Sequence, residues 1–193
     1  FPPGGTADIL GRMLGDKLAV VTSQSVIIEN RAGAAGGIAA QSVAKSPADG
    51  YTLLFGTTGT QTMNPAINSK STTQMGRGGQ QLSAGFSGRS QLGVTTSRFV
   101  KAVGCANLKE LIELANKKPG VLRYASFGTG SSAHMTGEMF KLRAGVDITH
   151  VPYKGAGPAL IDVIGGHVDM MFTLTPSVVQ HLRSGSLRAI AVA

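Results

Sequence analysis

The stretch VLRYASFGTGSSAHMTGEMFKLRAGVDITHVPYKGAGPALIDVIGGHVDMMF, residues 121–172, decides the fold. Short apolar segments typical of buried strands (VLRYAS, ITHV and VDMMF) alternate in it with segments that favour helices, residues 132–142 and 158–164. Strands that alternate with helices in this way are typical of parallel βαβ units. The stretch therefore predicts an α/β fold in which a mostly parallel sheet is flanked by helices.

The alternation extends in both directions from this stretch. A helix over residues 107–118 begins at the N-cap residue Asn107, with Glu110 three positions later, and ends before Pro119-Gly120. Residues 176–182 predict a further helix, and LRAIAVA predicts a final strand. The first sixty residues predict a helix over 6–18, a buried strand over 25–29, a helix over 36–45 and a buried strand over 51–55.

The helix over residues 6–18 has its apolar residues on one face. They are Ile9, Leu10, Met13, Leu14 and Leu18, at the spacing of an amphipathic helix.

Residues 68–104 interrupt the pattern, because they show neither helical nor alternating periodicity and are rich in Gly, Ser, Gln and Arg. A structureless stretch of this length is uncommon inside a compact domain. It is an atypical insertion, a run of wrongly assigned residues or a connection between lobes, and no chemistry is read from it. We expect a first lobe over residues 1–98 and a second over residues 99–193. Because the chain starts at Phe1 and stops inside an apolar run, we also expect it to be a piece of a longer protein.

The formal net charge of +8 raises the question of nucleic-acid binding. No predicted helix has a basic face interleaved with aromatic residues, and Trp is absent, so the stacking platforms of single-strand binders are missing. We therefore expect no nucleic-acid partner. Five of the basic residues lie in one stretch without Asp or Glu: Lys70, Arg77, Arg89, Arg98 and Lys101.

Cysteine and histidine usage argues against a metal site. Cys105 is the only cysteine, which excludes an internal disulfide and a Cys-based metal cluster. His150, His167 and His181 are scattered without carboxylates at ligand spacing. No run approaches the roughly 18 consecutive apolar residues of a membrane helix, and we expect any export signal to have been removed.

Two Gly-rich turns of one design open helices, FPPGGTAD at residues 1–8 and SFGTGSSAH at residues 126–134. The backbone N–H groups at a helix N-terminus favour anions, and glycines let a ligand approach the backbone closely. GTTGT at residues 56–60 follows a predicted strand and belongs at the same carboxyl edge of the sheet. Together the turns suit a small carboxylate, although capping of a helix is the plainer interpretation of any one of them.

The candidate ligand-binding residues come from these turns and from the segment after ITHV. There Tyr153 is preferred to Lys154, which is more often a solvated surface lysine. Two alternatives stay open: His134 lines the cleft or caps its turn, and Asn64 faces the cleft or begins an Asn-Pro turn. The candidate set is Phe1, Gly5, Thr6, Ala7, Asp8, Thr57, Thr58, Thr60, Ser126, Gly128, Thr129, Gly130, Ser131, Ser132, His134 and Tyr153.

The segment GTGSSA at residues 128–133 also fits the G-x-G-x-x-A fingerprint of dinucleotide binding, with Asp147 about 20 residues further on. The alternative function is therefore an NAD(P)-dependent oxidoreductase. Asp147 precedes a predicted strand, however, whereas the ribose-binding acid belongs at the end of one. A hydrolase is disfavoured because no G-x-S-x-G motif occurs, and Ser132 and His134 lie too close together for a triad.

Several segments together resemble the solute-binding proteins of tripartite tricarboxylate transporters, also called the Bug family. The resemblance covers about residues 1–67 and 107–193, in order and with similar spacing. It is carried by FPPGGTADILGRMLGDKL, IIENRAGAAGGIAAQSVAKSPADGYTLLFGT, NPAI, YASFGTGSSAHMTGEMFKL and HVPYKGAGPALIDVIGGHVDMMF. The chain departs from the family in residues 68–104, where members have an apolar strand and a crossover, and members continue past AIAVA.

The resemblance implies a two-lobed periplasmic-binding-protein-like (type II) fold and a periplasmic receptor. Such a receptor closes on a mono- or dicarboxylate or an amino-acid derivative and delivers it unchanged to membrane permease subunits. Carried over by position, the ligand loops are residues 1–8 and 126–134, with Thr57, Thr58 and Thr60 from the third turn. We expect a monomer that is not an enzyme and needs no cofactor or metal.

Overall fold

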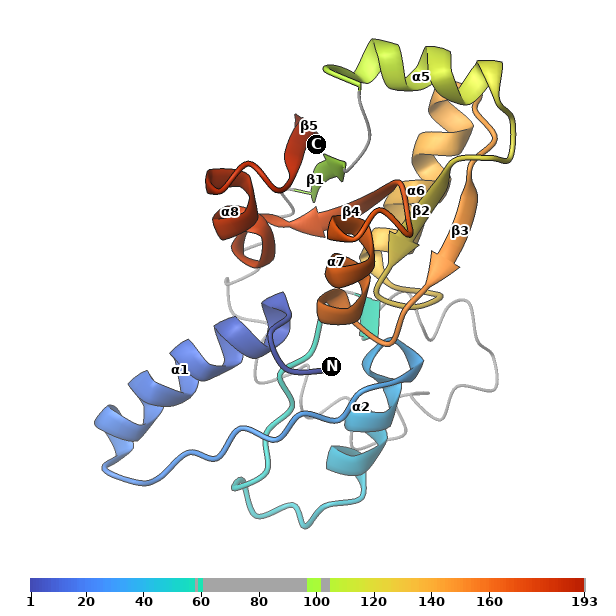
Figure 1. The fold of residues 1–193 in the computed structure, drawn as a ribbon. Coiled ribbons are helices and arrows are strands. Elements are labelled where there is room, and N and C mark those ends of the chain that lie inside the picture. The colour runs from blue at the N-terminus through green and yellow to red at the C-terminus, as the bar shows by residue number, and fades with distance from the viewer. Residues whose placement is uncertain (58, 61–96, 102–104, 193) are drawn as a thin grey trace.

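The computed structural model describes residues 1–57, 59–60, 97–101 and 105–192 (Figure 1). The described residues up to 60 form three helical elements, α1 (Thr6–Thr22), the short 3₁₀ helix η1 (Ala34–Gly36) and α2 (Gly37–Ala44). Those from 97 onward form a sheet and the helices that cover it. These elements are β1 (Ser97–Lys101), α5 (Leu108–Lys117), β2 (Arg123–Ser126), α6 (Ser132–Ala144), β3 (Thr149–Pro152), α7 (Ala156–Ile164), β4 (Met170–Leu174), α8 (Thr175–Arg183) and β5 (Arg188–Val192).

The strands of the described residues form one sheet in the order β3-β2-β4-β1-β5. β2 pairs in parallel with both β3 and β4, as the alternation of strands and helices predicts. β1 is antiparallel to both β4 and β5, so β5 runs in the same direction as β4. The expected α/β fold with a mostly parallel sheet is therefore confirmed, and β1 is the reversed strand among those described.

β1 lies inside the stretch in which the sequence shows no periodicity. Its backbone is paired on both sides, with Phe99 opposite Phe172 of β4 and Ala191 of β5. The position of so short a strand depends on these long-range partners more than on its own residues. The lobe boundary expected after residue 98 falls within this strand.

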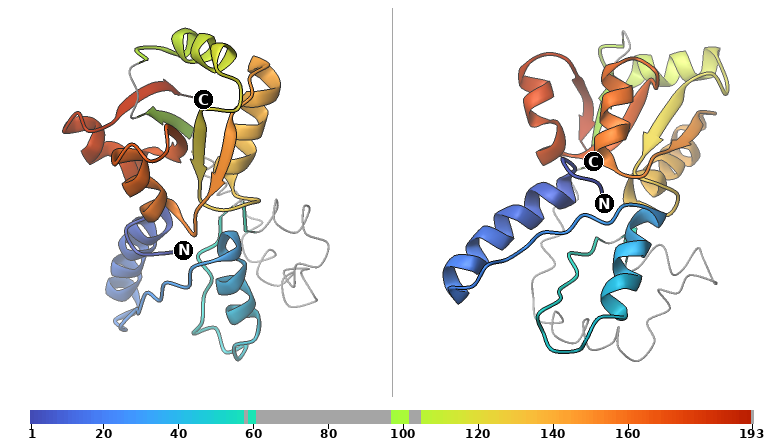
Figure 2. Two further views of the ribbon diagram at one scale, coloured as in Figure 1. Left: turned by 45° about the vertical axis from the view of Figure 1, so that its right-hand side comes forward. Right: turned by 60° about the horizontal axis from the view of Figure 1, so that its bottom comes forward.

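The core surrounds β2 and β4, in which Tyr124, Met170 and Met171 are fully buried. α6 and α7 lie over opposite faces of the sheet (Figures 1 and 2), because successive right-handed crossovers lead first outward to β3 and then back to β4. α5 begins at its predicted N-cap, where Asn107 Oδ1 accepts a 3.0 Å hydrogen bond from the amide of Glu110. The predictions for α5 to α8 are thus confirmed, with ends that agree within two residues.

The buried strands expected over residues 25–29 and 51–55 are wrong. Neither segment is paired in a sheet, and Ile27 and Tyr51 are largely exposed. Apolar composition alone predicted strands here, but a strand forms only where a neighbouring segment pairs with it. No such neighbour lies within the described residues.

The helix predicted over residues 6–18 is confirmed as α1, but its apolar face is largely exposed. Met13 is 61% exposed and Leu14 49% exposed, whereas Gly11 and Gly15 are buried. The small residues form the packed face because the chain crosses them closely: a Cβ on Gly15 would lie 3.1 Å from Ile28 Cδ1. The covered face of α1 is therefore the one on which side chains of the neighbouring segments, Val26 and Ile28, pack against glycine.

Gly137→Ala is expected to lower the free energy of unfolding by about 1–3 kcal/mol. The added Cβ would overlap the buried ring of Tyr124, whose hydroxyl donates a 2.7 Å hydrogen bond to Glu138. Gly11→Ala is the matched control, because this helical glycine would make only an ordinary contact of 3.9 Å with Phe55. The control should be neutral or stabilising by up to about 1 kcal/mol. Urea unfolding measures both, and equal effects would contradict the packing described.

Candidate functional site

The carboxyl ends of β2, β3 and β4 lie at one edge of the sheet, which faces α1 and α2 in Figure 1. Parallel strands bring the loops that follow them to the same edge, where open α/β sheets bind ligands. The turn at residues 126–134 connects β2 to α6, residues 153–155 connect β3 to α7, and α8 follows β4 directly. All three connections therefore face the first part of the chain.

The turn at residues 1–8 packs against the connection between β3 and α7. A Cβ on Gly5 would lie 3.4 Å from the Cβ of Ala156, and the ring of Pro2 fills the position that a Cβ on Gly155 would take. The N-terminal ends of α1 and α7 are therefore in direct contact. Gly155 is needed here because its Cβ-free face receives the proline ring.

A chain of hydroxyl groups joins α1 to α8. Thr6 Oγ1 donates a 2.9 Å hydrogen bond to Ser177 Oγ, and Ser177 Oγ lies 3.1 Å from Thr173 Oγ1 and donates to the carbonyl of Leu174. Thr6 was among the candidate ligand-binding residues, but Ser177 was not. The position of Ser177, on a helix that starts directly after a buried strand at the ligand-binding end of the sheet, could have identified it.

The turns at residues 126–134 and 56–60 meet beside η1. A Cβ on Gly128 would lie 3.6 Å from the amide nitrogen of Ala35, and one on Gly59 would lie 3.2 Å from Cα of Ser131. Thr60 Oγ1 donates a 3.0 Å hydrogen bond to the carbonyl of Ala35. Gly128 has φ +123°, a conformation that L side chains rarely adopt.

The three predicted turns are thus brought to one junction, and most of the candidate residues lie there. The ring of Phe1 lies beside Gly36, which also touches Thr60. Thr57 supports Thr60, because their hydroxyl oxygens lie 3.0 Å apart. Thr58 and Asn64 lie outside the described residues, so both remain predictions.

The amide groups of the two main turns differ in their partners. The N-caps of α1 and α7 make no side-chain cap hydrogen bond, and the amides of Thr6 and Ala7 have no partner among the described residues. In the turn before α6, by contrast, Gly128 N donates to Ser126 Oγ and Gly130 N donates to His134 Nδ1. The amides of the two glycines in this turn are therefore engaged within the chain.

The start of α6 still offers donors. Ser131 is its N-cap, and its hydroxyl accepts a 3.3 Å hydrogen bond from the amide of His134. The amides of Ser132 and Ala133, and that of the exposed Thr129, have no partner among the described residues. Unpaired amides of this kind carry the positive end of the helix dipole.

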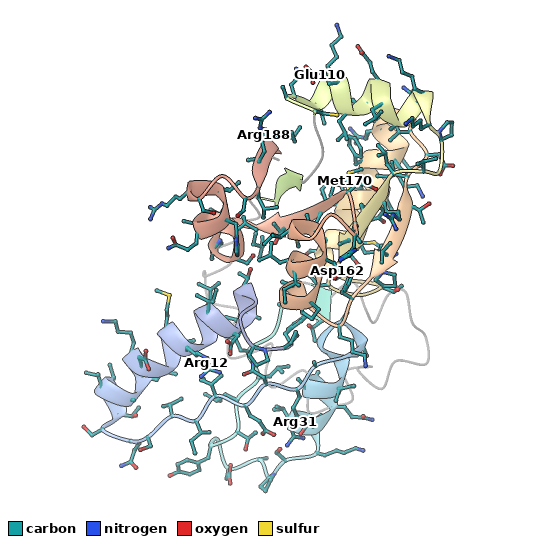
Figure 3. The ribbon with its side chains drawn as sticks, viewed as in Figure 1. Arg12, Arg31, Glu110, Asp162, Met170 and Arg188 are labelled. Carbon is teal, nitrogen blue, oxygen red and sulfur yellow. The ribbon has the colours of Figure 1, made fainter. Side chains whose placement is uncertain are left out.

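Asp8 fixes the first turn. Its Oδ2 accepts a 2.9 Å hydrogen bond from the amide of Gly4, and Arg12 Nε lies 3.0 Å from its Oδ1. Arg12, labelled in Figure 3, also donates to Asn30 on the neighbouring segment. Burial raises the pKa of Asp8, but Arg12 and the Gly4 amide outweigh it and hold the pKa below its ordinary value. The carboxylate is therefore ionised and paired within the chain.

Tyr153 and His134 have structural partners as well. The hydroxyl of Tyr153 donates a 2.6 Å hydrogen bond to Asp162 of α7 (Figure 3), and burial, followed by this bond, raises the Tyr153 pKa to about 12. His134 caps its turn through Nδ1, the second of the two roles considered for it. Lys154 is exposed, as a surface lysine should be.

The dinucleotide interpretation meets a geometric obstacle. The fingerprint segment follows the carboxyl end of β2, whereas the backbone carbonyl of Asp147 accepts a 3.0 Å hydrogen bond from Gly120, which lies before β2. Asp147 is therefore at the opposite edge of the sheet from the Gly-rich turn. A ribose bound beside that turn would not reach it.

No group of three or more His, Cys, Asp or Glu side chains that could hold a metal ion occurs among the described residues. In the same part of the chain, no helix combines the length and the apolar character needed to cross a membrane.

The family model for the tripartite tricarboxylate transporter family receptor matches residues 10–193. Among curated proteins, BugT of Bordetella pertussis is 36% identical to the chain over 197 residues. That alignment covers 100% of this chain and 58% of BugT, so the chain spans little more than half the length of this relative.

Two solved structures share the fold. An R. palustris protein solved with adipate has a TM-score of 0.79 and 32% identity, covering 100% of this chain and 62% of its own. MatC from Rhodopseudomonas palustris, with bound malate, has a TM-score of 0.79 and 26% identity, covering 100% of this chain and 64% of its own. The fold is that of periplasmic binding proteins, as expected. The family and these neighbours are receptors rather than enzymes, and the oxidoreductase alternative gains no support from them.

Asp8→Asn should lower the free energy of unfolding at neutral pH by about 1–3 kcal/mol, because the ion pair with Arg12 is lost. The folded pKa of Asp8 lies below the ordinary value of 3.8, so its stabilising effect is complete above that value and is lost as the pH falls through the folded pKa. The free energies of unfolding of wild type and variant, measured by urea unfolding as a function of pH, should therefore converge in acid.

The exposed Asp16 on the same helix provides the control for Asp8. Asp16→Asn should change stability by less than about 0.5 kcal/mol. A difference between wild type and Asp8→Asn that stays constant into acid would mean that the Asp8 charge does not stabilise the turn.

Thr6→Val and Ser177→Ala should not be additive. Each removes the same hydroxyl contact between α1 and α8, so a double-mutant cycle should give a coupling energy of about 0.5–1.5 kcal/mol. Thermal or urea unfolding of the four proteins measures it. A coupling energy of zero would show that the two hydroxyl groups do not interact in solution.

Proposed function

The chain belongs to the tripartite tricarboxylate transporter receptor family, and we propose that it captures a small organic carboxylate at the junction of the three turns and releases it unchanged. The observation that carries this proposal is the set of amides at the starts of α1 and α6 that have no partner among the described residues. The start of α1 contacts α7, and the turn before α6 contacts Gly59 and η1, at the same end of the sheet. Such amides favour an anion by charge-assisted hydrogen bonds.

The ligand class follows from the donors. Backbone amides and hydroxyl groups recognise carboxylate oxygens whatever carbon chain is attached to them. Relatives have been solved with adipate and with malate, and we place the ligand of this chain among mono- and dicarboxylates and amino-acid derivatives. Ser126 and His134, the groups nearest to a nucleophile and a base, are engaged in holding the turn. The protein therefore binds the acid without catalysing a reaction on it.

The expected affinity is modest. Each charge-assisted hydrogen bond contributes about 1.5–3 kcal/mol, and association costs several kcal/mol or more. A few such bonds leave about 8 kcal/mol, which corresponds to a dissociation constant of roughly 1 μM. An affinity in this range is compatible with both capture and release.

The biological setting that we propose is that of a periplasmic receptor. Residues 1–98 and 99–193 contribute to two lobes, and closure of the lobes around the ligand removes its carboxylate from water. The loaded receptor, a monomer, then delivers the acid to membrane permease subunits. Contact between the turns across the junction supports this arrangement, because a ligand held by both turns favours the closed form.

Ser132→Pro tests the site while preserving the helix. Ser132 is the first residue of α6, where proline is well tolerated, and Ser131 before it has the extended conformation that proline requires (φ −75°, ψ 161°). The substitution removes the Ser132 amide donor together with the hydroxyl. Ser132→Ala, the matched control, removes the hydroxyl alone.

Isothermal titration with adipate and with malate should show binding by wild type and by Ser132→Ala within about threefold. Binding by Ser132→Pro should be at least about tenfold weaker, for the loss of one charge-assisted bond. If Ser132→Pro bound the acids as tightly as the wild type, the start of α6 would not be part of the site. If NAD alone, and no organic acid, stabilised the wild-type protein in a thermal-shift screen, the proposed function would be wrong.

A further inference from the structure

Two histidines from different elements contact the turn before α6. The rings of His134 on α6 and His150 on β3 stack with centroids 4.2 Å apart and an interplanar angle of 25°. His150 also stacks on Tyr124 of β2, at 4.9 Å. No role for His150 could be predicted from the sequence, because only the parallel pairing of β2 with β3 brings it to this position.

Each histidine is connected to one glycine amide of the turn. His134 Nδ1 accepts a 3.2 Å hydrogen bond from Gly130 N. His150 Nε2 lies 2.6 Å from Ser126 Oγ, which accepts a 3.2 Å hydrogen bond from Gly128 N. The two rings therefore support the two glycines that shape the turn.

The hydrogen bond from Gly130 assigns the tautomer of His134. Ser126 Oγ lies 2.6 Å from His150 Nε2 and 3.3 Å from the carbonyl of Gly128, and its single proton serves one of these two acceptors. His134 must have a bare Nδ1, because an N–H cannot accept the amide of Gly130. A proton added at this Nδ1 would replace an attraction with a clash between two donors.

The surroundings keep both rings neutral near neutral pH. The charged groups that face them among the described residues are Glu138 and Lys141, which pair with each other at 3.5 Å. Burial, and more weakly Lys141, lower the pKa of His134 against the opposing effect of Glu138. The pKa of His150 falls to about 4, because of burial and then of His134. The groups of β2 that contact the His150 ring are uncharged: Tyr124, whose hydroxyl donates a hydrogen bond to Glu138, and Ser126.

We propose that His134 is a positioning residue for the carboxylate site, which holds the Gly128–Ser131 turn in its binding form only while Nδ1 is unprotonated. Ser132 and Ala133, whose amides face the proposed ligand, directly follow this turn and share its geometry. Acid would release Gly130, displace those amides and weaken binding. The inference rests on the proposed function for its effect on affinity, but the contact between His134 and Gly130 is testable without any ligand.

Three variants separate the roles of the ring. His134→Asn places an amide oxygen close to the position of Nδ1, so it accepts from Gly130 but does not titrate. His134→Leu removes the acceptor. His167→Asn is the control for loss of a histidine, because His167 is exposed and precedes β4, at the opposite edge of the sheet.

The dissociation constant for adipate should be measured by titration calorimetry from about pH 8 down to about pH 4, because burial lowers the pKa of His134 below that of an ordinary histidine. Ionisation of adipate affects every protein equally, so the comparison with His134→Asn isolates the ring. Wild type and His167→Asn should lose about tenfold more affinity in acid than His134→Asn. His134→Leu should bind about tenfold more weakly throughout, without an additional loss in acid.

A protonated ring that simply attracted the anion would instead tighten binding by the wild type in acid, and that result would overturn the proposal. So would identical pH profiles of wild type and His134→Asn. If no acid binds at any pH, the proposed function fails, and the ¹⁵N resonance of Gly130 in the free protein decides the remaining claim. It should shift with the titration of His134 in the wild type and stay constant in His134→Asn; a resonance unaffected in both would contradict the contact.

Discussion

Close approach of backbone to backbone across the junction is the constraint on which the site depends. Pro2 fits against Gly155, η1 lies against Gly128, and Gly59 lies against Ser131. A Cβ at Gly155 or Gly59 would push these segments apart, and at Gly128 the φ of +123° disfavours any side chain. The loops that follow β2 and β3 can therefore act together with α1 only because small residues occupy the points of contact.

This contact determines where positive charge is concentrated. Helices α1 and α7 begin at the junction without side-chain caps, and the carboxylate of Asp8 is already matched by Arg12. Among the described residues of these turns, the amides at the starts of α1 and α6 remain as donors without a partner. Donors of this kind are fixed by the backbone, so they recognise a carboxylate without reorganisation and leave the rest of the ligand to other contacts.

Much of the fold and the location of the site could be predicted from the sequence, and the limits have physical reasons. Asn107 and the alternation after it are local signals, so α5 to α8 and β2 to β5 were recognised. Residues 25–29 and 51–55 were not strands, because pairing depends on a neighbour that the local sequence does not report. The Gly-rich turns marked the site, but the amides of Gly128 and Gly130 proved to be engaged by Ser126 and His134. That engagement depends on tertiary contacts, and so does the role of Ser177.

The most direct test of the account is an NMR titration of the ¹⁵N-labelled protein with adipate. We predict that the amides of Thr6 and Ala7 at the start of α1 and those of Ser132 and Ala133 at the start of α6 shift together, along one binding isotherm. Shifts confined to one of the two helix starts, or shifts at both with different affinities, would contradict a single carboxylate held by both parts of the chain.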